Sequence, residues 1–252
     1  MDEVKEMLRS NPALDINWRD VRENGCSALH QACESGHDSI VSILLAHPGI
    51  DVNAKDDSGK TPFFTACDMG STSCVRLLLQ DQLVMIDEPD NDGGTSLRRA
   101  AYCGHYDVIK LWIASGREMD LGKPGDIYKT DVIGAAKKYR RTEVVTLLER
   151  FKENPEETRQ AARVGIDWYN SRAVEMFALV IFVSDELLQI KETVAIQAMR
   201  FFSIVRKLPL ELQMVLCHRS VGSTKEIIQR RDSEVAFKSL AESLLWSSIF
   251  TN

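Results

Sequence analysis

Four residues near the start of the chain have the side chains and the spacing of a metal site: Cys26, His30, Cys33 and His37. Zinc is bound in proteins by thiolate and imidazole groups of this kind, arranged as a tetrahedron around the ion. A structural zinc site requires all four side chains to converge on one point. The local fold therefore decides whether this spacing has a chemical meaning.

Two further stretches resemble chemical sites. Gly59-Lys60-Thr61 has the ending of a phosphate-binding loop, but that motif needs an earlier glycine where this chain has Ala54. Cys217 and His218 are adjacent, and adjacent residues on a helix do not face each other, so we interpret them as a buried cysteine beside a surface histidine. No other grouping of His, Ser or carboxylate residues has a spacing typical of catalysis. The sequence predicts a protein that is not an enzyme and has no cofactor and no metal.

The elements that position these residues belong to an internal repeat. Three segments align with a period of 34 residues, at 25–36, 59–70 and 93–104. Each begins and ends with Gly, carries Ser or Thr at its third position and has small residues near its middle. An apolar helical pattern follows each segment, at 40–45, 74–79 and 108–113. Because glycine readily adopts positive φ, the closing glycines indicate a turn after a first helix.

These segments resemble ankyrin repeats, whose motif runs T-P-L-H-x-A, then G-H, then V-x-x-L-L, then D-V-N. The chain has Ala28-Leu29-His30, Thr61-Pro62 and Gly104-His105 in register with that motif. In this register His30, Cys33 and His37 occupy ordinary repeat positions, which argues against zinc. The Gly-Lys-Thr stretch is likewise the opening of a repeat.

The resemblance implies an all-α fold with short hairpin loops, in which helix pairs stack into a solenoid. A degraded fourth copy aligns from Thr130, with Tyr139 in place of the turn glycine, and residues 4–8 indicate a lone second helix. We expect a capping half-repeat at 1–20 and about four repeats at 21–152. Small residues should let the first helices of neighbouring repeats approach closely. Leu44, Leu78 and Trp112 recur at one helical position and should fill the shared core.

The resemblance also implies a binding surface, because ankyrin arrays bind partner proteins on a concave face formed by hairpin tips and first helices. Carried over position by position, it predicts partner contacts at Glu23, Asn24, Glu34, Ser35, Asp57, Ser58, Lys60, Asp68, Met69, Asn91, Asp92, Tyr102, Cys103, Lys137 and Lys138. Tyr102 and Met69 are the expected anchors, since aromatic and Met side chains are enriched at interfaces. The surface runs from acidic to basic, and would steer a partner with one basic and one acidic end.

Charge and hydropathy narrow the class of protein. Of the formal net charge of −6, −5 falls before Glu153, where 24 acidic residues outnumber 19 basic ones. This balance argues against general nucleic-acid binding, which requires basic residues to displace phosphate counterions. The longest apolar run, 176–183, is far below the roughly 20 residues that span a membrane, and the first residues lack the pattern of a secretory signal. We expect a cytoplasmic or nuclear monomer with six reduced cysteines.

The stretch 137–141 is a dense basic cluster, Lys-Lys-Tyr-Arg-Arg, in the fourth copy. We interpret it as a solvated edge. The alternatives are a nuclear-import signal and a contact with an acidic ligand.

Helical patterns continue to the end of the sequence and predict an all-helical C-terminal domain at 153–252. The expected helices are at 171–191, 193–207, 208–218 and 233–246. Their simplest role is to cover the apolar end of the solenoid. The stretch 208–246 also resembles an F-box, a motif that recruits ubiquitin ligases, through Leu208-Pro-Leu-Glu-Leu and Trp246. A SOCS-box match fails, because Leu212 and Cys217 are five residues apart rather than four.

We therefore expect a non-catalytic interaction module or scaffold that binds a partner protein of unknown identity and no small-molecule substrate. The alternative is a substrate-recruiting adaptor of a ubiquitin ligase. In that case the repeats select the substrate and the F-box-like helices recruit the ligase.

Overall fold

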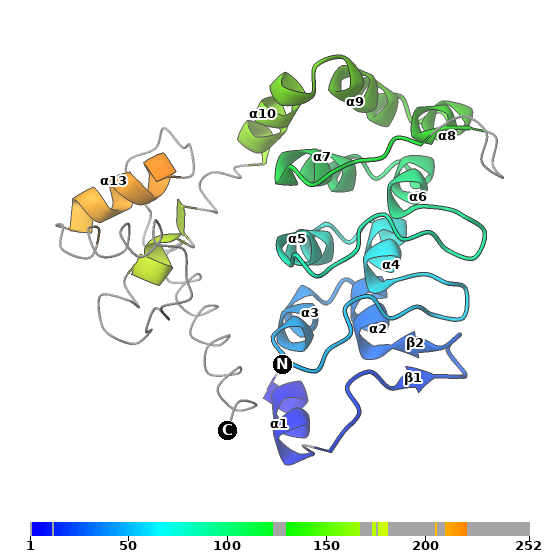
Figure 1. Cartoon of the computed structure of the whole chain (residues 1–252), viewed down its shortest axis with the longest axis vertical. Coiled ribbons are helices and arrows are strands. Elements are labelled where there is room, and N and C mark those ends of the chain that lie inside the picture. The colour runs from blue at the N-terminus through cyan, green and yellow to red at the C-terminus, as the bar shows by residue number, and fades with distance from the viewer. Residues whose placement is uncertain are drawn as a thin grey trace. The chain divides into compact units, whose positions relative to one another are not determined.

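The computed structural model describes residues 2–11, 13–122, 130–166, 173–174, 176–180, 205 and 210–220. These residues fall into two compact units. The first takes in the described residues up to Ala162, and the second takes in those from Arg163 onward. Figure 1 shows the helices and strands of both units with the labels used below.

The first unit is a stack of helix pairs joined by hairpin loops, which confirms the predicted all-α solenoid (Figure 1). The first helices of the pairs form one column: α2 (Ala28–Glu34), α4 (Pro62–Met69), α6 (Ser96–Cys103) and α8 (Val132–Lys138). The second helices form another: α3 (Asp38–Leu45), α5 (Thr72–Gln80), α7 (Tyr106–Ser115) and α9 (Thr142–Glu153). The lone helix α1 (Asp2–Ser10) lies at one end of the stack, as expected for a half-repeat.

Loops connect neighbouring pairs through hydrogen bonds to the main chain. Asn17 Nδ2 donates to Gly49 O at 2.7 Å, and Asn17 Oδ1 accepts from Asp51 N at 2.8 Å. Asn53 forms the equivalent two bonds with residues 83 and 85. The strands β1 (Arg19–Asp20) and β2 (Cys26–Ser27) pair antiparallel in the first hairpin. These asparagines satisfy backbone groups of the next loop and so set the spacing between repeats.

The first helices α4, α6 and α8 each begin at a residue whose side chain accepts a hydrogen bond from a free backbone N–H group. Thr61 Oγ1 accepts from Phe64 N at 3.2 Å, and Thr95 caps α6 in the same way. In the fourth repeat Asp131 has this role, with Oδ1 accepting from Gly134 N at 2.6 Å. The alignment of Thr130 with Thr61 is therefore wrong by one residue. Such caps stabilise a helix by about 1 kcal/mol.

The turn after each first helix needs a left-handed backbone. Gly70 has φ of 71°, and a Cβ atom there would lie 2.5 Å from His105 Nδ1. In the fourth repeat the left-handed residue is Arg140, with φ of 57°, and Tyr139 comes before it with φ of −102°. The expectation that Tyr139 replaces the turn glycine is thus corrected to Arg140. The shift follows from the later cap at Asp131.

The core lies between the two columns of helices and follows the predicted pattern. Leu44, Leu78 and Trp112 are all buried, as their recurrence indicated. Trp112 packs edge-on against Phe63, with ring centroids 5.1 Å apart and an interplanar angle of 77°. Small buried residues face neighbouring first helices, among them Ala66, Cys67, Ala100 and Ala101. All six cysteines are described, and none forms a disulfide.

The helix α10 (Pro155–Gly165) begins at the proline after Asn154, where the sequence predicted a helix start. From Arg163 onward the described residues are mainly helical, including α13 (Leu210–Ser220), which matches the expected helix at 208–218. Buried residues of this second unit form one hydrophobic cluster, Val174, Phe177, Val180, Val205 and Cys217. The rest of the expected helices at 171–191 and 193–207, and that at 233–246, lie outside the described residues. So does most of the F-box-like stretch, which stays a prediction.

The pair Cys217 and His218 differs from the expectation. Both side chains are buried, so the prediction of a surface histidine is wrong. The reason is that α13 buries more than one face, since Gln213 and Cys217 lie four residues apart and His218 follows directly. Burial raises the pKa of the Cys217 thiol to about 12, so this thiol is protonated at neutral pH. Of the described helices, none is long and apolar enough to cross a membrane.

Candidate partner-binding surface

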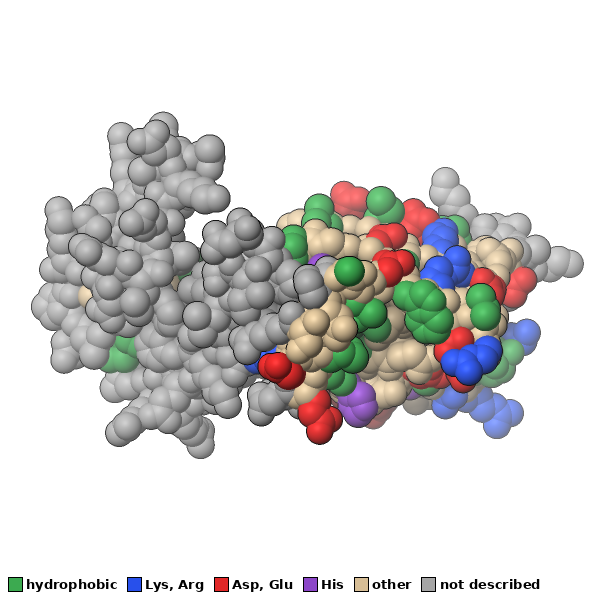
Figure 2. All heavy atoms as spheres, turned by 90° about the horizontal axis from the view of Figure 1, so that it is seen from below, with side chains coloured by type: hydrophobic (Ala, Val, Ile, Leu, Met, Phe, Trp, Pro, Cys, Tyr) green, Lys and Arg blue, Asp and Glu red, His purple; other side chains and the backbone are tan. Residues whose placement is uncertain are grey.

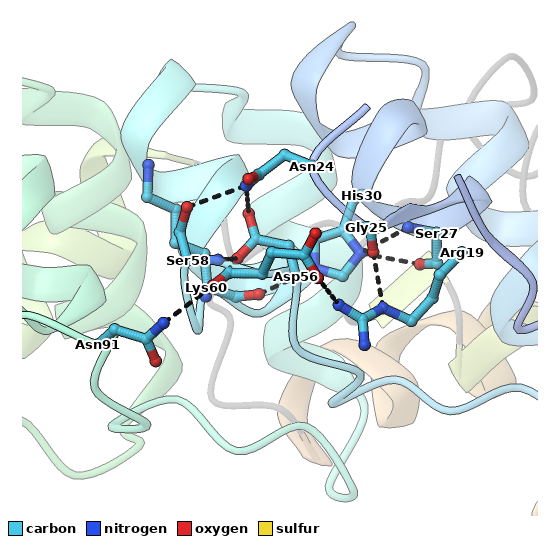
Figure 3. Close-up of polar contacts among 10 residues, drawn as sticks. Arg19, Asn24, Gly25, Ser27, His30, Asp56, Ser58, Lys60 and Asn91 are labelled. Atoms are coloured by element: carbon cyan, nitrogen blue, oxygen red, sulfur yellow. Dashed lines mark hydrogen bonds and ion pairs between the residues drawn. The ribbon is translucent and has the colours of Figure 1, made fainter. Parts of the chain in front are cut away.

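The hairpin tips of the first three repeats are connected to one another by hydrogen bonds (Figure 3). Asp57 N donates to Asn24 O, and Asn91 N donates to Ser58 O, both at 2.9 Å. The side-chain amides form two more bonds. Asn24 Nδ2 donates to Ser58 Oγ at 2.9 Å, and Asn91 Nδ2 donates to Asp57 O at 2.9 Å. These four predicted contact residues therefore hold the tips together. Asn24, Asp57 and Asn91 are also exposed to solvent.

His30 connects the first helix of one repeat to the hairpin of the next (Figure 3). Its Nδ1 accepts from Ser27 N at 3.2 Å, so Nε2 carries the proton and donates to Lys60 O at 3.0 Å. Burial lowers the pKa of His30, because the charged ring is poorly solvated in the interior. Both ring nitrogens are bonded within the protein, which leaves neither for a metal ion. Across the described ranges, no group of His, Cys, Asp and Glu is arranged to hold one.

Asp68 lies beneath two cations instead of at the surface. Its side chain is 6% exposed, with Oδ1 2.6 Å from Arg99 Nε and Oδ2 3.6 Å from Lys60 Nζ. Cys103, another predicted contact residue, donates from Sγ to the same Oδ1 at 3.7 Å. The expectation of an exposed Asp68 is thus incorrect. Its carboxylate positions Lys60 and Arg99, which lie above it.

A groove of about 370 Å³ opens beside these groups, between the hairpin at 90–94 and the first helices. Its lining combines four basic side chains with three aromatic rings and two carboxylates. The lining residues are Lys60, Phe64, Asp90, Asp92, Gly94, Thr95, Arg98, Arg99, Tyr102, Lys138 and Tyr139. The structure thus brings together four of the predicted contact residues: Lys60, Asp92, Tyr102 and Lys138.

Three of the basic side chains in this groove lie over aromatic rings. The distances from cation to ring centroid are 5.5 Å for Lys60 over Phe64, 5.0 Å for Arg99 over Tyr102 and 5.6 Å for Lys138 over Tyr139. The rings of Tyr102 and Tyr139 are themselves 4.1 Å apart between centroids and tilted by 58°. Cations over ring faces are stabilised by the ring quadrupole, by about 0.5–1 kcal/mol at exposed sites. Consecutive repeats therefore supply one cation–ring pair each.

Comparisons with known proteins agree with this geometry. A family model described as ankyrin repeats (3 copies) matches residues 50–123, and one described as ankyrin repeat matches residues 24–57. Residues 24–123 of this chain are thus ankyrin repeats. Ankyrin repeats imply protein–protein interaction, and the groove lies in the array that carries them.

The relatives found among curated proteins match short stretches of this chain. The 26S proteasome non-ATPase regulatory subunit 10 of Rattus norvegicus is 39% identical over 62 residues, which are 25% of each chain. The Mus musculus protein of the same name matches to the same extent. The SMC5-SMC6 complex localization factor protein 1 of Bos taurus is 43% identical over 47 residues, 19% of this chain and 4% of the relative. The match thus spans a quarter or less of each relative.

Other predicted contact residues of the ankyrin array lie outside the groove. Lys137 Nζ pairs with Glu149 Oε1 at 2.7 Å, which directs it toward the second helix α9. Met69 on α4 is 46% exposed. Three further predicted residues are exposed in the first repeat, namely Glu23, Glu34 and Ser35.

Sequence reasoning missed Arg98, Arg99, Phe64 and Tyr139 in this groove. Arg98 stands at the repeat position that holds a buried His30 and a buried Phe64 in the first two copies. A basic residue at a position that is otherwise buried was the available signal. Arg98 Nη2 donates to Thr130 Oγ1 at 3.1 Å, which connects the third repeat to the fourth.

The end of the ankyrin array that carries α1 exposes hydrophobic side chains. Trp18 is 57% exposed, Val21 85%, Met7 50% and Leu14 46%. Figure 2 looks at the molecule from this end and shows hydrophobic side chains among acidic and basic ones. Because α1 is a single helix and not a helix pair, it covers the first repeat only partly.

Proposed function

We propose that this protein is a non-catalytic interaction module whose ankyrin array binds a partner protein across its hairpin tips and first helices. The observation that supports this most is the groove at the second to fourth repeats. It places aromatic and arginine side chains, the types most enriched at the centres of protein interfaces, in one concave site. A protein segment would thus find both apolar and charged groups there.

Side chains of the groove contact one another within the protein. Asp68 positions Lys60 and Arg99, and Tyr102 packs against Tyr139. Side chains that are already ordered lose less conformational entropy when a partner binds. Such contacts favour recognition of a particular protein segment.

The names of the relatives fit a role in assemblies. One is a regulatory subunit of the 26S proteasome and the other a localization factor of the SMC5-SMC6 complex. Each shares only a short stretch of sequence with this chain. We take from them the general role of a scaffold or adaptor and leave the partner open.

Site-specific photo-crosslinking tests the proposal on the full chain. Benzoyl-phenylalanine would replace Met69, which is exposed on the first helix α4, or Ser73, which is exposed on the second helix α5. We expect covalent adducts with a partner protein in cell lysate from position 69, and few from position 73. An excess of unmodified chain should compete these adducts away. Adducts formed equally at both positions, or only at Ser73, would place the partner on another face.

A further inference from the structure

The groove at the second to fourth repeats has a particular charge arrangement. Lys60 and Arg99 share the buried carboxylate of Asp68, so these two cations carry one compensating charge between them. Lys138 lies on the groove wall, and within the described part of the chain it has no ion pair. The wall therefore carries excess positive charge in a protein whose net charge is −6.

The strongest concentration of this charge surrounds the two tyrosine rings. Arg99 lies over Tyr102 and Lys138 over Tyr139. Arg141 lies near the end of the same helix α6, since its Nε donates to the main-chain oxygen of Tyr102 at 3.1 Å. Tyr139 is 41% exposed, so its ring offers apolar area next to the Lys138 cation. We call Arg99, Tyr102, Lys138, Tyr139 and Arg141 the tyrosine pocket.

The opposite rim of the groove is acidic. Asp90 Oδ1 accepts from the main-chain nitrogens of Asp92 at 3.1 Å and Gly94 at 2.6 Å, so this carboxylate is held in the hairpin turn. Asp92 is exposed. A uniformly charged polyanion such as a nucleic acid would meet these two carboxylates as well as the cations. A peptide carries discrete charges and can place its acids at the tyrosine pocket alone.

We infer that the tyrosine pocket binds an acidic segment of a partner protein, in which carboxylates flank an aromatic or aliphatic side chain. The apolar side chain packs on the Tyr102 and Tyr139 rings, and the carboxylates pair with Lys138, Arg99 and Arg141. Charge complementarity is the reason for this choice of occupant. The inference rests on the proposed function, because it names the partner segment for one part of the same surface.

The first test selects peptides on the full chain from a library of random short peptides displayed on phage. We expect the enriched peptides to contain several Asp or Glu residues around one aromatic or aliphatic residue. Enrichment of neutral or basic peptides would overturn the inference. So would the absence of any peptide enriched above a blank surface.

The second test uses fluorescence anisotropy to measure the affinity of the chain for a dye-labelled synthetic copy of the most enriched peptide. Lys138→Glu should weaken binding at least about tenfold, because it reverses a charge at the contact. Tyr139→Ser should also weaken it, and added salt should weaken binding to the unmodified chain. The matched controls are Lys110→Glu and Tyr106→Ser on the second helix α7, where a lysine also lies over a tyrosine ring, at 5.9 Å. These controls should leave the affinity unchanged.

Circular dichroism would confirm that each variant is folded. Unchanged binding by folded Lys138→Glu and Tyr139→Ser would overturn the inference. If Asp57→Lys at the hairpin tips abolished binding while Lys138→Glu did not, the peptide would occupy another part of the same face. The inference would then fail while the proposed function stood. The proposed function itself is contradicted only by the crosslinking experiment, if adducts form equally at Met69 and Ser73 or only at Ser73.

Discussion

The second and third repeats differ from the fourth in the turn that follows the first helix. Gly70 and Gly104 adopt the left-handed backbone in the two regular repeats, with φ of 71° and 88°. In the fourth repeat Arg140 adopts it, next to the exposed ring of Tyr139. A residue with a side chain is less stable than glycine in this conformation by roughly 1–2 kcal/mol. The fourth repeat thus gives up stability at the position where it presents its basic and aromatic groups.

The difference suggests a division of roles along the array. Regular repeats use the turn for close stacking, as the approach of Gly70 to His105 shows. The fourth repeat instead lines the tyrosine pocket with Lys138 and Tyr139. Functional sites commonly contain such strained positions, which the surrounding structure supports.

The largest expected effect concerns the cores of the two regions. Trp112→Ala should lower the free energy of unfolding by about 3–5 kcal/mol, because the indole is fully buried against Phe63. Leu148→Ala in α9 should cost about 2–5 kcal/mol. Urea denaturation measures both values, and hydrogen exchange locates the damage. We expect Trp112→Ala to expose amides of α4 and α6, and Leu148→Ala to affect mainly α8 and α9. Equal exchange throughout the array in both variants would break the comparison.

A smaller loss is expected at the regular turn. Gly70→Ala should lower the free energy of unfolding by about 2 kcal/mol, since alanine is strained at positive φ. Its Cβ would also displace the ring of His105. Gly49→Ala is the control, because a Cβ there meets only ordinary contacts, at 3.4 Å from His47 Cε1. A similar loss in both variants would show that the left-handed turn is not the cause.

The opposite sign is expected at the fourth turn. Arg140→Gly should raise the free energy of unfolding by about 1 kcal/mol, because it removes the strain of a side chain at φ of 57°. Arg140→Ala removes the same charge and keeps the strain, so it should change stability little. Thermal melting of both variants separates the two causes. An equal gain from alanine would assign the effect to charge.

The smallest change is expected with pH and concerns the first repeat. Burial lowers the pKa of His30 in the folded protein, so below about pH 6.5 the unfolded chain binds a proton that the folded chain does not. The free energy of unfolding should therefore fall as the pH falls from about 7 to about 5. His47, whose pKa burial also lowers, contributes with the same sign. His30→Gln should flatten the dependence more than His47→Gln does, as urea titrations at both pH values would show.

The regular part of the fold could be predicted from sequence because glycine, small residues and apolar helices recur at one period. That periodicity identified Leu44, Leu78 and Trp112 as core residues. It failed where the spacing changes, and Asp131 took the cap that the alignment gave to Thr130. The groove could be predicted only in part. The exposure of Asp68 depends on the direction of the Arg99 side chain, which belongs to the next repeat. An alignment of repeats does not show where a side chain points.

The unequal burial of two tryptophans gives this protein an internal optical reporter. Trp112 is fully buried and its indole N–H donates to Glu118 O at 3.2 Å, whereas Trp18 is 57% exposed near the end of the array that carries α1. A buried indole emits at shorter wavelength than one in water, so the two should be separable in fluorescence spectra. With Trp168 and Trp246 replaced by Phe, a red shift of the short-wavelength emission would report loosening at the centre of the array. Quenching of the long-wavelength emission by iodide would measure how accessible Trp18 is to solvent, near the first repeat of the array.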